Sequence, residues 1–388
     1  MEIFFWLCLF YIGYVEVGYL ALLCLLSRFR AQDHLVGEIF PKVAVLIAVF
    51  NEEKIIQAKI ENTLALDYPP DKIQILIASD GSSDRTDDIV GEYTNAGVTL
   101  VRSSPRQGKI AALRAAENFI DGELVLFTDA DSMLEPGSLR LLARHFVDPK
   151  VGAVSGRERR PPTGADGKGK GEGLYNRIDT AIKTMEGSLG NQVGVHGGIF
   201  LMRRTLLPYV PDHLSHDAIV CLRLTLSGYK TLYEQEALSF EVYGLDTKQD
   251  WQRRVRTVLQ SIQSYLYVKE ALNPLKTGFY AFQILSHRFS RWFVFPVLIT
   301  ALVTNLLLIS RSPFYQAFAV IQLVCYLLAL IGFILDSIGK QPAIFYFPFY
   351  FVYIHIAAFW AVLLHLSRRK MTTWRPTERE TAHTIPNK

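Results

Sequence analysis

The 388-residue chain is poor in charge and in cysteine. Only 20% of its residues are Asp, Glu, Lys or Arg, below the roughly 25% of soluble globular domains. Half of the residues are apolar, and this excludes a disordered chain, which needs low hydrophobicity and high net charge. Four cysteines are too few for a small disulfide scaffold. A net charge of +4 gives no sign of nucleic-acid binding, so no nucleic acid is expected as a partner.

The apolar residues are concentrated at the two ends of the chain. Residues 3–26 carry one ionisable side chain, Glu16, and are long enough to span a bilayer, which takes about 20 residues. A signal peptide is the alternative, but no basic region precedes the segment, and Arg28 and Arg30 follow it. Because basic residues flank the cytoplasmic side of a span, the chain after this N-terminal helix, residues 1–30, is predicted to lie in the cytoplasm.

Three more apolar runs, at 292–309, 317–335 and 344–366, predict about three C-terminal transmembrane helices within 292–366. Core helices of a large soluble protein are the alternative, which three runs in so short a stretch disfavour. The segment before them, 246–291, mixes aromatic and basic side chains and is interpreted as interfacial amphipathic helices.

A polar tail, residues 367–388, closes the chain. Three spans after a cytoplasmic domain would place this tail outside the cell. Its basic residues favour the inside, because Lys and Arg accumulate on the cytoplasmic side. Either one apolar run is re-entrant and does not cross the bilayer, or the preference of basic residues for the cytoplasmic side fails in this chain. The sequence leaves both possibilities open.

Between the apolar ends, residues 40–245 have the pattern of a soluble α/β domain. Buried strands alternate with helices in it, the strands at 43–49, 73–78 and 124–127 and the helices at 55–66, 110–120 and 218–226. This alternation predicts a mainly parallel sheet with both faces covered. Ligands of such sheets bind beyond the carboxyl ends of the strands, so the polar residues that follow each strand are the candidates for a site.

Two acidic residues, Asp129 and Asp131, follow the third predicted strand at a spacing of two. Residues two apart in an extended segment face the same way. Two carboxylates on one side suit Mg²⁺ or Mn²⁺, whose remaining ligands would be water and substrate phosphate. A polar turn whose Asp residues cap the next helix is the alternative.

Two segments contain glycines where a backbone can approach a ligand. Gly108 and Lys109 precede the helix at 110–120 and are suited to a diphosphate, although the first Gly and the Ser or Thr of a P-loop are missing. A solvated loop lysine is the alternative. Gly197 and Gly198 come after Val193-Gly194-Val195 and His196, and they allow close approach to a ligand or simply form a tight turn.

Asp217 stands at the start of the helix predicted at 218–226. Either Ser215 or Asp217 caps this helix. Alternatively, Asp217 is a general base whose pKa is modulated by the adjacent His216.

The segment from Asp250 to Arg256 contains three arginines and one tryptophan. Arginines bind phosphate through paired hydrogen bonds. The alternative is a basic interfacial helix that contacts anionic lipid.

Taken in order, these residues resemble the membrane-bound family 2 glycosyltransferases, the group of cellulose, chitin and hyaluronan synthases. A single motif is weak evidence for this family, but five motifs in the correct order, together with matching membrane segments, are specific evidence. The match runs from Val43 to the Trp-Arg-Pro-Thr-Glu-Arg sequence at 374–379. The resemblance implies a GT-A fold, a Rossmann-like α/β domain that binds a nucleotide sugar at the cytoplasmic face.

The resemblance also implies roles for individual residues. Asp80 resembles the carboxylate that holds uracil, the segment from Gly173 to Gly198 resembles the acceptor side, and Asp217 resembles the catalytic base. The other implied positions, for donor or metal, are Asn51, Glu52, Lys109, Asp129, Asp131, Gly197, Gly198, Gln252, Arg253, Arg254 and Arg256.

Two positions depart from the family's pattern. His216 precedes the implied base where the family usually has an acidic residue. The Gln-x-x-Arg-Trp motif lacks its Trp, since Val255 or Arg256 stands there. In the polymer synthases this Trp stacks on the acceptor sugar, so the departure puts processive chain growth in doubt.

The expected function is inverting, metal-dependent transfer of a sugar from a UDP-sugar to a growing polysaccharide or lipid-linked glycan. The resemblance places it on the cytoplasmic face of the inner (plasma) membrane, with the bilayer, the donor, the acceptor and subunits for export as partners. Two alternatives stay open. One is a non-processive transferase that adds a single sugar to a lipid, and the other is a membrane transporter or scaffold with a degenerate sugar-nucleotide domain.

Overall fold

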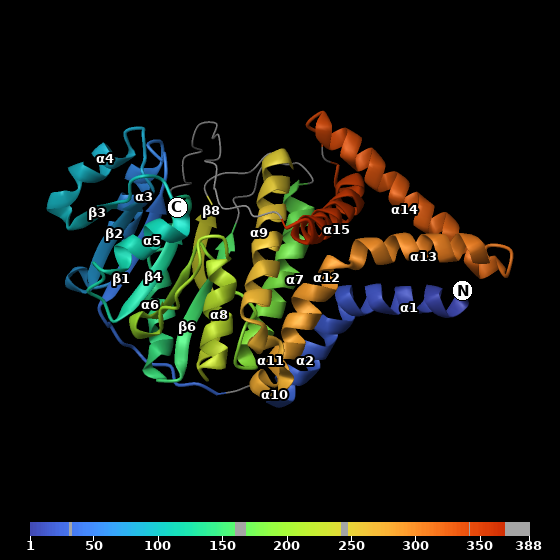
Figure 1. The fold of residues 1–388 in the computed structure, drawn as a ribbon, viewed down its shortest axis with the longest axis horizontal. Helices are drawn as coiled ribbons and strands as arrows, with labels where there is room; N and C mark the ends of the chain where they lie inside the picture. Colours follow the sequence, from blue (N-terminus) through green and yellow to red (C-terminus); the bar gives the residue numbers. More distant parts are fainter. Residues whose placement is uncertain (31–32, 160–167, 242–246, 341, 369–388) are drawn as a thin grey trace.

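The computed structural model describes residues 1–30, 33–159, 168–241, 247–340 and 342–368. An α/β domain lies beside a group of long apolar helices (Figure 1). The predicted polar tail falls outside the described residues except for its first two positions.

The α/β domain is built on one eight-stranded sheet of order β3-β2-β1-β4-β7-β6-β8-β5. Its parallel half contains β1 (Val43–Val49), β2 (Ile73–Ser79), β3 (Val98–Arg102) and β4 (Leu124–Asp129). The other half contains β5 (Ser132–Leu134), β6 (Val151–Arg159), β7 (Phe200–Arg203) and β8 (Lys230–Glu241). There β7 runs antiparallel to β4 and β6, β8 parallel to β6, and β5 antiparallel to β8. The sheet is therefore mixed beyond β4.

Helices cover both faces of the sheet, and this is why β1 is apolar along its whole length. Val43, Val45 and Ile47 pack into one core cluster with the helices of the first face, and Ala44 and Leu46 pack into a second cluster on the opposite face. The first face is covered by α3 (Ile56–Leu64), α4 (Thr86–Glu92) and α6 (Ser138–Ala143). The second is covered by α5 (Lys109–Glu117) and α8 (His216–Leu226).

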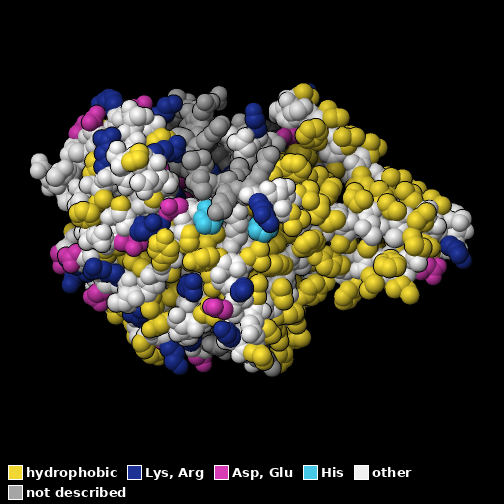
Figure 2. Space-filling view, in the orientation of Figure 1, with side chains coloured by type: hydrophobic (Ala, Val, Ile, Leu, Met, Phe, Trp, Pro, Cys, Tyr) yellow, Lys and Arg dark blue, Asp and Glu magenta, His cyan; other side chains and the backbone are white. Residues whose placement is uncertain are grey.

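Three helices of the described residues are long and apolar enough to cross a membrane. The first, Glu2–Phe29, is continuous through α1 (Glu2–Gly13), a π-helical turn η1 (Tyr14–Gly18) and α2 (Tyr19–Arg30). The others are α14 (Pro313–Ser337) and α15 (Ala343–Leu366). The protruding part of the molecule has a largely apolar surface, whereas charged side chains gather over the sheet domain (Figure 2).

The first of the three predicted C-terminal runs differs from the other two. It forms α13 (Val294–Leu308), which is 15 residues long and is bent by 59° from the helical segment Phe279–Trp292. The bent pair makes a fourth candidate span only if both parts are counted as one. Among the described residues, two C-terminal helices are thus full-length candidate spans, and the third predicted run is a shorter helix at a bend.

Two 21-residue helices, α7 (Lys168–Ser188) and α9 (Thr247–Tyr267), connect the sheet domain to the apolar helices. Both pack against α15, and α7 also packs against α2 and β8. Glu186 of α7 is fully buried and accepts hydrogen bonds from the Tyr19 hydroxyl at 2.7 Å and the His287 Nδ1 at 2.8 Å. This junction fixes the N-terminal span to the domain.

Short elements complete the chain: η2 (Pro70–Lys72), η3 (Thr94–Ala96), η4 (Arg144–Val147), η5 (Arg204–Leu206), η6 (Lys269–Leu272), α10 (Pro274–Thr277), α11 (Phe279–Ile284), η7 (Leu285–Phe289) and α12 (Ser290–Trp292).

Candidate active site

The carboxyl ends of three parallel strands meet at one edge of the sheet. β1 pairs with β2 so that Val49 lies beside Ser79, and with β4 so that Ala48 lies beside Asp129. The residues that follow these strands therefore emerge next to one another. This register brings Asp80, after β2, to the same edge as the acidic turn after β4.

Asp80 is buried and organises the loop that leads into α5. One carboxylate oxygen accepts hydrogen bonds from the backbone N–H of Gln107 at 2.8 Å and of Gly108 at 2.9 Å. The other lies 3.3 Å from Arg106 Nε, and the Arg106 guanidinium stands 3.6 Å above the ring of Phe50. Asp80 thus fixes the loop before α5, where the family resemblance implies that the nucleotide base binds.

Asn51 and Glu52 join the turn after β1 to the turn after β2. Asn51 has a positive φ of 55°, and its side-chain oxygen accepts a hydrogen bond from Ser83 N at 2.8 Å. Glu52 is buried, and its backbone N–H donates to the Thr86 hydroxyl at 2.8 Å. Both residues therefore hold the two turns together beside Asp80.

Lys109 begins α5 and forms an ion pair with Asp129 at the end of β4. Burial by itself would raise the pKa of Asp129, but the Lys109 ammonium holds that pKa below its ordinary value. Burial would likewise lower the pKa of Lys109, and the charge of Asp129 raises it. Lys109 therefore presents a cation at the N-terminus of α5, where anions bind favourably.

Asp131 adds a second carboxylate to the same turn. Burial raises the pKa of Asp131 to about 7, and the charges of Asp129 and Glu241 contribute in the same direction. A divalent cation would relieve this repulsion, and carboxylates are the ligands that Mg²⁺ and Mn²⁺ prefer. Among the described residues, no group of three or more His, Cys, Asp or Glu side chains forms a metal site. The two Asp residues fit a metal that takes its other ligands from water and phosphate.

Lys59, on α3, lies fully buried behind this turn. Its ammonium donates hydrogen bonds to the Thr128 hydroxyl at 2.9 Å and to the Ser132 carbonyl oxygen. Burial lowers the pKa of Lys59 to about 7, and the charges of Asp129 and Asp131 oppose this shift. Lys59 was not predicted as a site residue from the sequence, since a lysine on a helix is ordinarily exposed.

Asp217 lies in the first turn of α8, and Ser215 is the N-cap residue of that helix. The Ser215 hydroxyl accepts a hydrogen bond from Ala218 N at 3.4 Å, so the capping role belongs to Ser215. Burial raises the pKa of Asp217 to about 6, while the Lys109 ammonium lowers it and Asp129 raises it. A carboxylate with such a pKa can accept a proton near neutral pH.

The two adjacent glycines lie where side chains approach the backbone closely. A Cβ on Gly197 would lie 3.1 Å from both side-chain oxygens of Asp217. A Cβ on Gly198 would lie 2.6 Å from the Ser132 hydroxyl and 2.7 Å from Glu158 Oε1. A side chain at either position would therefore require Asp217, or Ser132 and Glu158, to move.

His216 packs against aromatic rings. Its ring centroid lies 4.7 Å from that of Phe127 and 5.5 Å from that of Phe200. Burial lowers the pKa of His216 to about 3, so its imidazole is neutral. An uncharged ring adds no charge beside Asp217, whereas the charges of Lys109 and Asp129 do act on it, so the structure gives no support to the hypothesis that His216 modulates the base.

The arginines of α9 face two different neighbours. Arg253 forms an ion pair with Glu241 at the end of β8. Arg254 pairs with Asp250 at 2.5 Å and donates to the Tyr350 hydroxyl of α15 at 2.6 Å. Arg253 therefore lies at the site edge of the sheet, whereas Arg254 joins α9 to the apolar helices.

The other predicted residues of α9 also lie in different surroundings. Gln252 is exposed. Burial and the charge of Arg253 lower the pKa of Arg256, and the charge of Asp129 opposes this shift, so Arg256 lies within electrostatic range of the acidic turn. Trp251 packs against Tyr353 of α15 with ring centroids 5.4 Å apart. The only aromatic residue of this motif therefore lies against a candidate membrane helix.

Two acidic residues at this edge, Glu158 and Glu241, were not predicted from the sequence. Glu158 lies 3.3 Å from His196 Nε2 and accepts a hydrogen bond from the Ser132 hydroxyl, also at 3.3 Å. Both carboxylates raise the pKa of Arg253, against the effect of its burial. No local pattern marks them, because each is a single acid near the end of a strand whose partners are distant in sequence.

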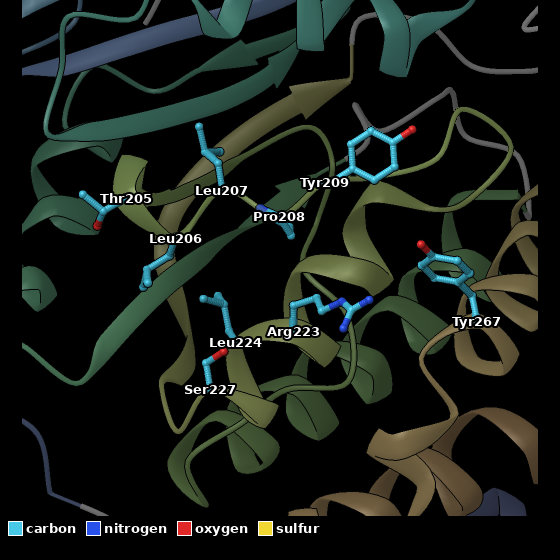
Figure 3. Close-up of a pocket in the computed structure, with 9 residues that line it drawn as sticks. All are labelled: Thr205, Leu206, Leu207, Pro208, Tyr209, Arg223, Leu224, Ser227 and Tyr267. Atoms are coloured by element: carbon cyan, nitrogen blue, oxygen red, sulfur yellow. The ribbon is translucent and has the colours of Figure 1, made fainter.

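A pocket of about 370 Å³ lies elsewhere on the domain, between residues 205–209 and the side chains of Arg223 and Tyr267 (Figure 3). Residues 205–209, which line it, come soon after β7 in the chain. Strand β7 runs antiparallel to β4, with Phe200 beside Phe127. The end of β7 therefore points away from the Asp129 edge, and this pocket is separate from the candidate active site.

Comparison with known proteins agrees with this arrangement. Residues 44–209 match glycosyl transferase family 2. A poly-beta-1,6-N-acetyl-D-glucosamine synthase of Staphylococcus epidermidis is 30% identical over 222 residues, which cover 55% of this chain and 53% of that protein. A probable glycosyltransferase of Bacillus subtilis, YdaM, is 35% identical over 125 residues, 31% of this chain and 30% of that protein. The chain thus spans about half or less of the curated relatives it matches.

The fold has a counterpart over nearly the whole chain. A mannosyltransferase of Pyrobaculum calidifontis, solved in complex with GDP-Man and Mn²⁺, aligns with 94% of this chain and 99% of its own, with a TM-score of 0.72 and 20% identity. At that identity the likeness concerns the fold, and it includes the helices outside the sheet domain. Residues 44–209 are therefore a glycosyltransferase family 2 domain, carried on a chain with the GT-A fold.

Proposed function

We propose that the protein is an inverting, metal-dependent glycosyltransferase that moves a sugar from a nucleotide sugar to a polysaccharide or lipid-linked acceptor. One observation carries this proposal. The Lys109–Asp129 ion pair, Asp131 and Asp217 share one edge of the sheet, and the charges of Lys109 and Asp129 reach Asp217. A cation for the leaving group, a metal-binding turn and a candidate base thus lie together in a family 2 domain.

On the donor side, the sugar leaves a nucleoside diphosphate, whose developing charge needs stabilisation. Lys109, at the N-terminus of α5, would bind the diphosphate together with Arg253. A divalent cation held by Asp129 and Asp131 would supply Lewis-acid stabilisation of the same charge. Such fixed charges in a partly buried site stabilise a leaving group more than they would in water.

On the acceptor side, Asp217 would remove the proton of the attacking hydroxyl. Gly197 allows the acceptor segment to pass directly over this carboxylate. A single base acting opposite the leaving group gives one displacement with inversion, so an α-linked donor would yield a β-linked product. A β-linkage stands in the name of the Staphylococcus relative, which supports this stereochemistry.

The donor we propose is a UDP-sugar, with N-acetylglucosamine as the first sugar to test because of that relative's name. The fold counterpart was solved with GDP-Man, so a guanine nucleotide is the direct competitor. Asp80, the proposed base-contact residue, accepts hydrogen bonds, and both uracil and guanine offer N–H donors to such a group.

We further propose that the domain lies on the cytoplasmic face of the plasma membrane. Arg28 and Arg30 follow the first span. If the two candidate spans α14 and α15 both cross the bilayer, they return the chain to the side of the domain. This count removes the conflict with the basic tail, since the bent α13 segment need not cross the bilayer. The segment 246–291, which precedes that bend, is proposed to lie at the interface.

Whether the acceptor grows processively is the remaining part of the proposal. The name of the Staphylococcus relatives supports a polysaccharide product. Subunits for its export would then be further partners. Addition of one sugar to a lipid is favoured by the motif at 252–256, whose Trp is missing and whose Trp251 packs on α15.

Product analysis with the purified protein in lipid separates these possibilities. The assay would combine Mg²⁺ or Mn²⁺ with labelled UDP-N-acetylglucosamine, other UDP-sugars and GDP-mannose. A long product would support the processive form, and a single sugar on lipid the alternative. A folded protein that transfers no sugar from any donor would contradict the proposal and favour the scaffold.

A further inference from the structure

The metal-binding turn is anchored by a side chain to which no role has been assigned. Lys59 is fully buried, although a lysine is among the residues least often buried without a partner. Its ammonium reaches the two positions that flank the acidic pair, Thr128 before Asp129 and Ser132 after Asp131. One cation thus bridges both ends of the turn.

A second residue of α3, Asn62, strengthens the same connection. The Thr63 hydroxyl takes no part in it, since it donates to the Lys59 backbone carbonyl oxygen at 2.8 Å within the helix. Asn62 exchanges two hydrogen bonds with the backbone of Leu134, each of 2.9 Å. Because residues three apart lie on one helix face, Lys59 and Asn62 hold successive parts of the chain from the turn into β5.

A buried lysine at this position is better explained by support of a metal site than by a gain in the stability of the fold. Burying an ammonium is costly, and an apolar side chain of similar volume is often tolerated as well or better. The lysine does, however, fix the chain on both sides of two carboxylates that repel each other. Groups behind metal ligands orient them, and their loss typically lowers metal affinity or activity by about 10-fold to 100-fold.

We propose that Lys59 is a positioning residue for the divalent-metal site, holding Asp129 and Asp131 in the arrangement that binds the ion. The proposal rests on the metal dependence set out under the proposed function. A buried lysine on α3 thus supports the acidic turn, whose sequence motif contains only the two aspartates.

The test is Mn²⁺ affinity of the full-length protein in lipid nanodiscs, measured from the electron paramagnetic resonance signal of free Mn²⁺ with UDP present. For Lys59→Met we expect the dissociation constant for Mn²⁺ to rise by about 10-fold or more. Thr63→Val is the matched control, since it alters a buried side chain on the same helix face without touching the turn. It should leave Mn²⁺ affinity unchanged.

A second variant keeps the test decisive if Lys59→Met does not fold, as judged by thermal unfolding. Thr128→Val removes one acceptor of the ammonium and should weaken Mn²⁺ binding less than Lys59→Met. In the double variant the two effects should not add, because they break the same bridge.

Two results would overturn the proposal. Folded Lys59→Met and Thr128→Val proteins that bind Mn²⁺ as tightly as the unchanged protein would remove the positioning role. In that case Asp129→Ala should still abolish binding, and the proposed function would stand. No Mn²⁺ binding by the unchanged protein would instead refute the metal site, and this inference with it.

Discussion

The backbone of Gly197 lies against the carboxylate of Asp217, since a Cβ on Gly197 would lie 3.1 Å from both carboxylate oxygens. We therefore expect Gly197→Ala to push the Asp217 carboxylate aside by a few tenths of an ångström. A displaced base loses its alignment with the acceptor, so kcat should fall by about tenfold. Steady-state kinetics with saturating donor would measure this.

Gly91→Ala is the control for that substitution, because a Cβ at Gly91 meets no atom within 4 Å. It lies on α4, where alanine is the better helix former. We expect this variant to keep full activity and to melt no earlier than the unchanged protein. Equal activity of Gly197→Ala and Gly91→Ala would show that the contact with Asp217 has no catalytic consequence.

The pH dependence of transfer should reflect the raised pKa of Asp217. A base must be deprotonated to accept a proton. Activity should therefore be full well above pH 6 and should be lost as the pH falls through about 6. The measurement is kcat/KM between pH 5 and pH 8 at saturating metal, on protein whose folding is checked at each pH. A profile that stays flat down to pH 5 would contradict the role of Asp217.

His216 should not influence that profile. Its neutral ring packs on Phe127 and Phe200, and its pKa of about 3 keeps it uncharged throughout the range. We expect His216→Leu to lower the free energy of unfolding by about 1–2 kcal/mol through altered packing. The midpoint of the pH profile should remain near 6. A midpoint shifted by a full pH unit would restore the idea that His216 tunes the base.

The number of C-terminal spans can be read from the side on which the tail lies. With α14 and α15 as full spans, an epitope added after Lys388 should lie on the side of the sheet domain. Protease should remove it from inside-out vesicles and not from intact spheroplasts. Cleavage in spheroplasts alone would mean that the bent segment through α13 also crosses the membrane.

The parallel half of the sheet was predictable because its signals are local. β1, β2 and β4 are short apolar runs that end in polar turns, and helices with amphipathic patterns separate them. Parallel strands carry their polar turns to a common edge, so the placement of Asp80 and Asp129 at one edge of the sheet followed from the prediction of a parallel sheet.

The rest of the site was not predictable because it depends on distant pairings. Glu241 reaches the acidic turn because β8 pairs with β5, and Glu158 does so from β6. Lys59 was not predicted, since a charged residue on a short helix gives no sign of burial. The bend before α13 was equally hidden, because composition alone does not distinguish a broken apolar helix from a continuous span.

The most direct test of the account compares Asp217→Asn with the unchanged protein in two assays on the same lipid-reconstituted samples. Asparagine keeps the shape of the side chain but cannot accept the acceptor's proton. We predict that binding of the nucleotide sugar in the presence of Mn²⁺ is unchanged, while transfer falls by about 10²-fold to 10⁴-fold. Transfer at the original rate by Asp217→Asn, or an α-linked product from an α-linked donor, would contradict the proposed inverting mechanism.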